Sequence, residues 1–165
     1  MRCSKQFLRF KNEGLKEFLA TVPRERYDDI GSDHSASPLC FFTFRDSDWF
    51  YEKTHSKNSP FLGMVKVEYH DELCWGFAFK GDVIDPGHVD DIEFCLKQAL
   101  TVINPYLPVR GPRMHVSSNG YRYFNDISGD LCNFSGTERV EDKDGKCIYK
   151  MSYNGGCINL WLISA

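Results

Sequence analysis

The sequence predicts an α+β fold, in which one antiparallel sheet of about eight strands carries two helices on one face. Two stretches have the apolar spacing of an amphipathic helix, and each is followed by segments in which apolar and polar residues alternate, as in half-buried strands. Aromatic residues make up 15% of the chain, and such residues are enriched in strands. The predicted unit is therefore a helix followed by four antiparallel strands, used twice.

The two predicted units also share residue types, at an offset of about 73 positions. The matched positions are Phe61 with Phe134, Gly63 with Gly136, Val67 with Val140, and Phe50-Tyr51 with Tyr123-Phe124. We interpret the pattern as an internal duplication within a single domain, residues 1–165. Repeat one covers about residues 12–81 and repeat two about residues 94–155, and the tail 156–165 adds a strand or covers a sheet edge.

Each predicted helix has one apolar stripe and a clear end. The first helix is expected from residue 12 or 13 to Val22, where Pro23 stops it. The second is expected to begin at Asp90, which can cap it together with Glu93, and to end before Asn104-Pro105. The stripes are Leu15, Phe18, Leu19 and Val22 in the first helix, and Ile92, Cys95, Leu96, Ala99, Leu100 and Ile103 in the second.

Segments with a period of two predict the strands. They are residues 39–44, 49–53, 64–69, 73–80, 114–118, 121–125, 136–141 and 146–153. Asn119-Gly120 and Asp144-Gly145 predict type I′ hairpin turns, because their residues tolerate positive φ. We interpret the strand glycines, such as Gly63 and Gly136, as bulges or bends. Residues 24–38 have no apolar periodicity and predict a loop.

Composition argues against several classes of partner. The net charge is −3 and no basic block occurs, which argues against nucleic acid, and no apolar run is long enough to span a membrane. Seven cysteines lie scattered, without the spacing of a metal site or of a disulfide framework, so all seven are expected as reduced thiols in a cytoplasmic protein. Neither a metal nor a cofactor is expected.

Motifs in the second half carry a resemblance to a known family. The motifs are Arg110-Gly111-Pro112-Arg113, Tyr121-x-Tyr123, Gly129-Asp130-Leu131, Phe134-x-Gly136-x-Glu138 and Tyr149-x-x-x-Tyr153-x-Gly155-Gly156. With them, residues 12–158 resemble an uncharacterised bacterial domain family that stands alone or follows a helix-turn-helix in transcriptional regulators. The resemblance implies no catalytic residues. In repeat one, Val65 and Phe79 replace the Glu and Tyr expected there.

Candidate site residues lie mainly in repeat two. Glu138 follows the phase of core-facing valines, so it is expected to be buried and paired with Arg110 or Arg113, whose guanidinium groups flank a stiff turn. We interpret the pair as a structural clasp, with a catalytic dyad as the alternative. The two arginines could also bind a carboxylate or phosphate of a ligand. His115 and Lys150 complete the candidate ligand-binding set.

Two functions remain open at this point. The aromatic row Trp75, Phe77 and Phe79 is expected to form the core under the helices, which leaves the opposite, small and polar face free for a partner. We therefore favour a noncatalytic binding module for a small molecule or a protein. The alternative is a small hydrolase or transferase built on Glu138, His115 and the Arg110/Arg113 pair.

Overall fold

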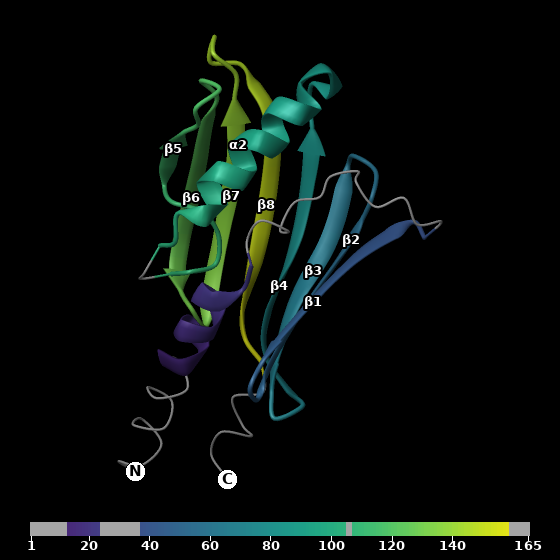
Figure 1. Cartoon of the computed structure of the whole chain (residues 1–165), viewed down its shortest axis with the longest axis vertical. Helices are drawn as coiled ribbons and strands as arrows, with labels where there is room; N and C mark the ends of the chain where they lie inside the picture. The colour runs from purple at the N-terminus through teal and green to yellow at the C-terminus, as the bar shows by residue number, and fades with distance from the viewer. Residues whose placement is uncertain (1–12, 24–36, 105–106, 159–165) are drawn as a thin grey trace.

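The computed structural model describes residues 13–23, 37–104 and 107–158. It contains two helices and one open antiparallel sheet of eight strands, in the order β1-β2-β3-β4-β8-β7-β6-β5 (Figure 1). The predicted α+β class is therefore confirmed. The strands are β1 Leu39–Asp46, β2 Trp49–Ser56, β3 Phe61–Tyr69, β4 Glu72–Val83, β5 Met114–Val116, β6 Arg122–Asp130, β7 Asn133–Glu141 and β8 Cys147–Cys157.

Both helices lie on the same face of the sheet (Figure 1). The first spans residues 13–21, and its predicted stripe is buried. The second, α2 Val89–Thr101, follows a short 3₁₀ helix, η2 Pro86–His88. Two details of the prediction are wrong: the residue before α2 is His88 rather than Asp90, and Ile103 is outside the helix and 39% exposed. No helix in the described ranges is long and apolar enough to cross a membrane.

The aromatic row forms the core, as predicted. Trp75, Phe77 and Phe79 of β4 are buried against the helices. Their neighbours Tyr149, Met151 and Tyr153 of β8 are also at most 4% exposed. The indole nitrogen of Trp75 donates to the carbonyl of Leu131 at 2.8 Å, which satisfies the polar atom of this buried side chain. Alternation along the strands thus separates a helix-covered inner face from an open outer face.

Gly63 and Gly136 make room for aromatic rings rather than forming bulges. A Cβ added at Gly63 would collide with the ring of Phe79, and one added at Gly136 would collide with the ring of Tyr153. The bulges lie elsewhere, where the pairing register shifts between Val67 and Glu68 and between Val140 and Glu141. The prediction of a bulge at Gly63 or Gly136 is therefore wrong, because the pairing register is unbroken there, and a bend at these positions stays a prediction.

The predicted hairpin turns occur, but with a different backbone. Gly120 and Gly145 have φ of 86° and 89°, whereas Asn119 and Asp144 do not have positive φ. The amide of Gly120 donates to the carbonyl of Ser117 at 2.9 Å and closes a β-turn over residues 117–120. The last residue of this turn is a left-handed glycine, as in longer hairpin loops. The type I′ prediction is therefore wrong at both sites. Positive φ at two successive residues occurs instead at His70 and Asp71, between β3 and β4.

The structure corrects one match between the predicted repeats. Tyr51 pairs with Val67 and Tyr123 pairs with Val140, and both tyrosines are fully buried. Tyr51 is therefore the counterpart of Tyr123, whereas the sequence pattern matched Tyr123 with Phe50, one residue earlier. The internal duplication itself stays a prediction. Most of the expected loop 24–38 and most of the tail 156–165 lie outside the described residues, although β8 includes Gly156 and Cys157.

The expectation that every cysteine is a free thiol is wrong. Cys132, in the turn between β6 and β7, forms a disulfide with Cys157 at the end of β8. The amide of Cys157 also donates to the carbonyl of Cys132 at 3.1 Å, so the turn is joined to β8 twice. Within the described ranges, the free cysteines are Cys40, Cys74, Cys95 and Cys147.

Thiol titration should therefore find two fewer free thiols in the denatured, nonreduced protein than in the reduced protein. In the native protein Cys95 should react slowly at pH 8, because burial raises its pKa to about 11 and keeps the thiol protonated. Titration with a chromogenic disulfide reagent, with and without prior reduction, measures the number of free thiols. The time course of the same reaction in the native protein measures the reactivity of Cys95. Equal counts in the two samples would contradict the disulfide and would favour the reducing compartment expected from the sequence.

Candidate functional site

Arg110 and Glu138 form a buried, bidentate ion pair, as predicted. Glu138 lies on the inner face of β7, and Arg110 lies in the segment that leads into β5. Nε of Arg110 donates to Oε2 of Glu138 at 2.9 Å, and one terminal guanidinium nitrogen donates to Oε1 at 2.7 Å. The two side chains are 2% and 0% exposed. Such fork geometry gives the strongest kind of charge-assisted hydrogen bond.

Two tyrosines complete the surroundings of this carboxylate. The hydroxyl of Tyr123 donates to Oε2 of Glu138 at 2.6 Å, and that of Tyr149 reaches Oε1 at 3.4 Å. Burial, followed by the negative charge of Glu138, raises the pKa of Tyr123 well above its usual value. The phenol therefore stays protonated and available as a donor. Glu138 has the partners that a buried carboxylate needs.

A second set of hydrogen bonds fixes the segment that carries Arg110. The side-chain amide of Asn125 donates to the carbonyl of Gly111 at 3.0 Å, and the Tyr153 hydroxyl donates to the Asn125 side-chain oxygen at 2.6 Å. The amide of Gly111 donates to the Tyr123 hydroxyl at 3.2 Å. Arg113 is exposed, so Arg110 is the partner of Glu138.

The five candidate residues do not form one site. His115 is half-buried on β5, next to Tyr123, and its Nε2 has no hydrogen-bond partner among the described residues. Lys150 is exposed on the outer face of β8, on the side of the sheet opposite Glu138. A carboxylate that is fully buried and bonded to three side chains has no surface to offer a substrate. Within the described ranges, no group of acidic, histidine and cysteine residues could hold a metal ion.

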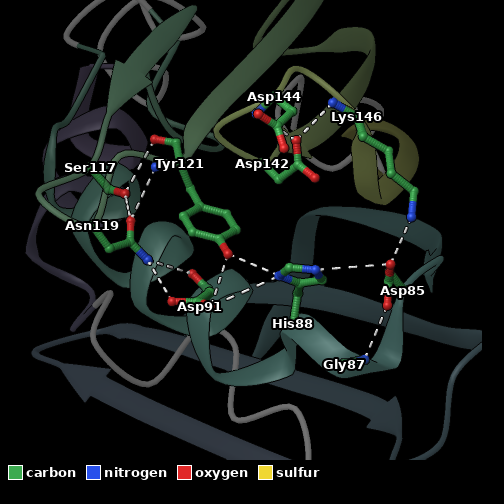
Figure 2. A network of polar contacts seen from close by, with 10 residues as sticks. All are labelled: Asp85, Gly87, His88, Asp91, Ser117, Asn119, Tyr121, Asp142, Asp144 and Lys146. Atoms are coloured by element: carbon green, nitrogen blue, oxygen red, sulfur yellow. Dashed lines mark hydrogen bonds and ion pairs between the residues drawn. The ribbon is translucent and has the colours of Figure 1, made fainter.

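A separate polar network joins three turns near the start of α2 (Figure 2). The Tyr121 hydroxyl donates to Asp91 at 2.9 Å and lies 2.9 Å from Nδ1 of His88. On the other side, Lys146 forms a 2.8 Å ion pair with Asp85, and this hydrogen bond lowers the pKa of the Asp85 carboxyl. The members come from the β4–α2 connection, the first turn of α2, the β5–β6 turn and the β7–β8 turn. We interpret this network as structural.

The outer face carries a groove over the middle of the sheet. It has a volume of about 690 Å³ and crosses β4, β8, β7 and β6. Its outer-face lining combines two charged side chains, Lys80 and Asp126, with short uncharged ones: Ala78, Ser128, Ser135, Thr137, Ser152 and Asn154. All of these residues are exposed. Neighbouring strands of a sheet lie about 4.8 Å apart, so a groove over four strands is about 14 Å long.

Register explains why the groove lies there. Ala78 pairs with Asn154, and Asn154 pairs with Ser135, which gives one row of short side chains across three strands. Ser152 lies between Lys80 and Thr137 in the next row. A second, more apolar hollow of about 360 Å³ adjoins the groove and shares Ala78 and Asn154 with it. The sequence signal that could have found this site is the pair of patterns Ser135-x-Thr137 and Ser152-x-Asn154.

Comparison with known proteins places the chain in a family. The family DUF5680, a domain of unknown function, matches residues 44–158. The chain belongs to this family. The DUF5680 match includes α2, the Arg110–Glu138 pair and every residue that lines the groove, and it begins within β1. Neither a curated protein nor a solved structure matches the chain.

Proposed function

We propose that this chain is a noncatalytic binding module that holds an extended protein segment in the groove on its outer face. The groove itself carries the proposal: it is open, about 690 Å³ in volume, and lined by short polar side chains that let another backbone approach the sheet. An extended chain advances by about 3.3 Å per residue, so a groove about 14 Å long takes about four residues.

The polar side chains of the groove are available to a partner. Thr137, Ser152 and Asn154 form no side-chain hydrogen bond with another described residue. Their hydroxyl and amide groups can therefore bond the backbone or side chains of a docked segment. The alternative of a hydrolase or transferase gains no support, because Glu138 is committed to Arg110 and Tyr123 in the core. The resemblance stated from the sequence implies members that stand alone or follow a helix-turn-helix, an arrangement that would also fit a module that binds.

Filling the groove should abolish binding without unfolding the protein. In Ala78→Arg, a long charged side chain replaces an exposed methyl group on the groove floor. Peptides selected from a displayed random library on the wild-type protein should bind this variant at least about tenfold more weakly in fluorescence-polarisation titrations. Thermal unfolding should stay close to that of the wild type, since the position is exposed.

Thr43→Arg is the matched control. Thr43 is exposed on β1 and does not line the groove, so the same long side chain there should leave peptide binding unchanged. A library that yields no binder to the wild-type protein would contradict the proposed function. So would peptides that bind Ala78→Arg as tightly as they bind the wild type.

A further inference from the structure

We propose that the groove selects protein segments with acidic side chains, whose carboxylates bind Lys80 and Lys150. This inference rests on the proposed function and adds the chemistry of the partner. Lys80 lines the groove on β4, and Lys150 lies on the outer face of the neighbouring strand β8. Both are exposed, and neither forms an ion pair with any residue in the described ranges.

Pairing register brings the two lysines close to each other. Lys80 is opposite Ser152, and the next pair on the same face is Asp82 opposite Lys150. Diagonal neighbours of this kind lie about 7–8 Å apart in an antiparallel pair. Side chains two positions apart in an extended segment point to the same side at about 7 Å. A segment with two acidic residues separated by one other residue therefore matches the spacing of the two lysine positions on the sheet.

The other charges near the groove already have partners. Arg139 of β7 lies 3.0 Å from Glu141 and 3.6 Å from Asp126, and its guanidinium group covers the ring of Phe124. Asp82 accepts a hydrogen bond from the hydroxyl of Ser59 at 2.7 Å. Among the described residues, the charges without an ion pair at this site are thus those of Lys80 and Lys150 against the single carboxylate of Asp82, an excess of positive charge in a chain whose net charge is −3. This local excess of positive charge favours an acidic partner.

Hydroxyl groups beside the lysines suit the same ligand. Ser152 lies next to Lys80, and Thr137 lies next to Ser152 on β7. Each can donate a hydrogen bond to a carboxylate that the ammonium groups attract. A nucleic-acid backbone suits the groove less well, because a continuous row of phosphates across the four strands would also meet the carboxylate of Asp126 on β6.

The test compares peptide selections on three proteins. A phage-displayed library of random peptides is selected on the wild type, on Lys80→Gln/Lys150→Gln, and on Lys97→Gln/Lys143→Gln. The last variant is the matched control, because it removes the same charge from two exposed lysines that do not line the groove. Wild-type and control selections should enrich peptides with two acidic residues at alternate positions. The groove variant should lose this enrichment and bind the selected peptides at least about tenfold more weakly.

The outcomes separate the inference from the proposed function. If selected peptides show no acidic preference but Ala78→Arg abolishes their binding, the groove binds segments and the acidic preference is wrong. If no peptide is enriched on the wild type, both proposals fail. A labelled single-stranded oligonucleotide that binds the wild type more tightly than the best peptide, and loses affinity in Lys80→Gln/Lys150→Gln, would overturn the inference in favour of a phosphate ligand.

Discussion

Arg110→Ala is expected to cost about 3–5 kcal/mol of the free energy of unfolding, a large share of what stabilises a domain of this size. The substitution leaves Glu138 buried, with 0% of its side chain exposed and without its cation. Glu138→Gln should also be costly, because it leaves the guanidinium group buried beside a neutral amide. Chemical denaturation followed by tryptophan fluorescence measures the loss, since Trp75 is fully buried.

A double-mutant cycle isolates the pair from other effects. Arg110→Ala combined with Glu138→Gln should cost less than the sum of the two single changes, because neither charge is then left alone. Arg113→Ala is the control, and it should change stability little, because Arg113 is exposed. Additive losses for Arg110 and Glu138, or an equal loss for Arg113→Ala, would show that the ion pair is not what holds this segment to the sheet.

Gly155→Ala is expected to destabilise the protein by about 3 kcal/mol or more, because it forces atoms into the centre of the sheet. Gly155 of β8 pairs with Phe77 of β4. A Cβ at this position would collide with the carbonyl oxygen of Gly76 and approach Cα of Phe77 to 2.5 Å. These are backbone atoms of a paired strand, so they cannot move aside without breaking the ladder. Thermal and chemical unfolding measure the loss.

Gly14→Ala is the matched control for this change. An added Cβ at Gly14 meets the ring of Trp49 at 3.5 Å, an ordinary contact, and alanine is the better helix former by about 0.5–1 kcal/mol. The control should therefore leave stability unchanged or raise it. Unfolding midpoints that fall equally in both variants, or a Gly155→Ala protein as stable as the wild type, would contradict the close approach of β4 and β8.

The periodicity of apolar residues predicts the fold well, because each helix and strand must place its apolar side chains on the one face that packs against the core. The stripe from Leu15 to Val22 and the row of aromatics on β4 both follow from the need to bury apolar surface on one side. Glu138 could be predicted as buried for the same reason, since it shares the phase of Val140. That Arg110 rather than Arg113 pairs with Glu138 could not be predicted, because the choice depends on the path of the chain before β5.

Features that depend on which segments meet in space were missed. Cys132 and Cys157 are 25 positions apart, and nothing in that spacing shows that a turn meets the end of a strand. The groove was missed because Ala78, Ser135 and Asn154 are ordinary residues of a solvated face until the order β4-β8-β7 places them in one row. Only the general choice of the outer face as the place for a partner came from the sequence.

The strand order also has a consequence for the kinetics of assembly. Strands β1 to β4 pair with their neighbours in chain order, and so do β5 to β8. The β4–β8 pairing, in contrast, joins partners from Val83 with Tyr149 to Trp75 with Cys157, which are 66 to 82 positions apart. The entropy lost on closing so long a connection opposes the first of these contacts, whereas each further residue pair adds little to that entropic cost. The two sets of sequential strands, β1 to β4 and β5 to β8, have low contact order and should therefore form early. Pairing of β4 with β8 should then set the rate at which the chain reaches its native state.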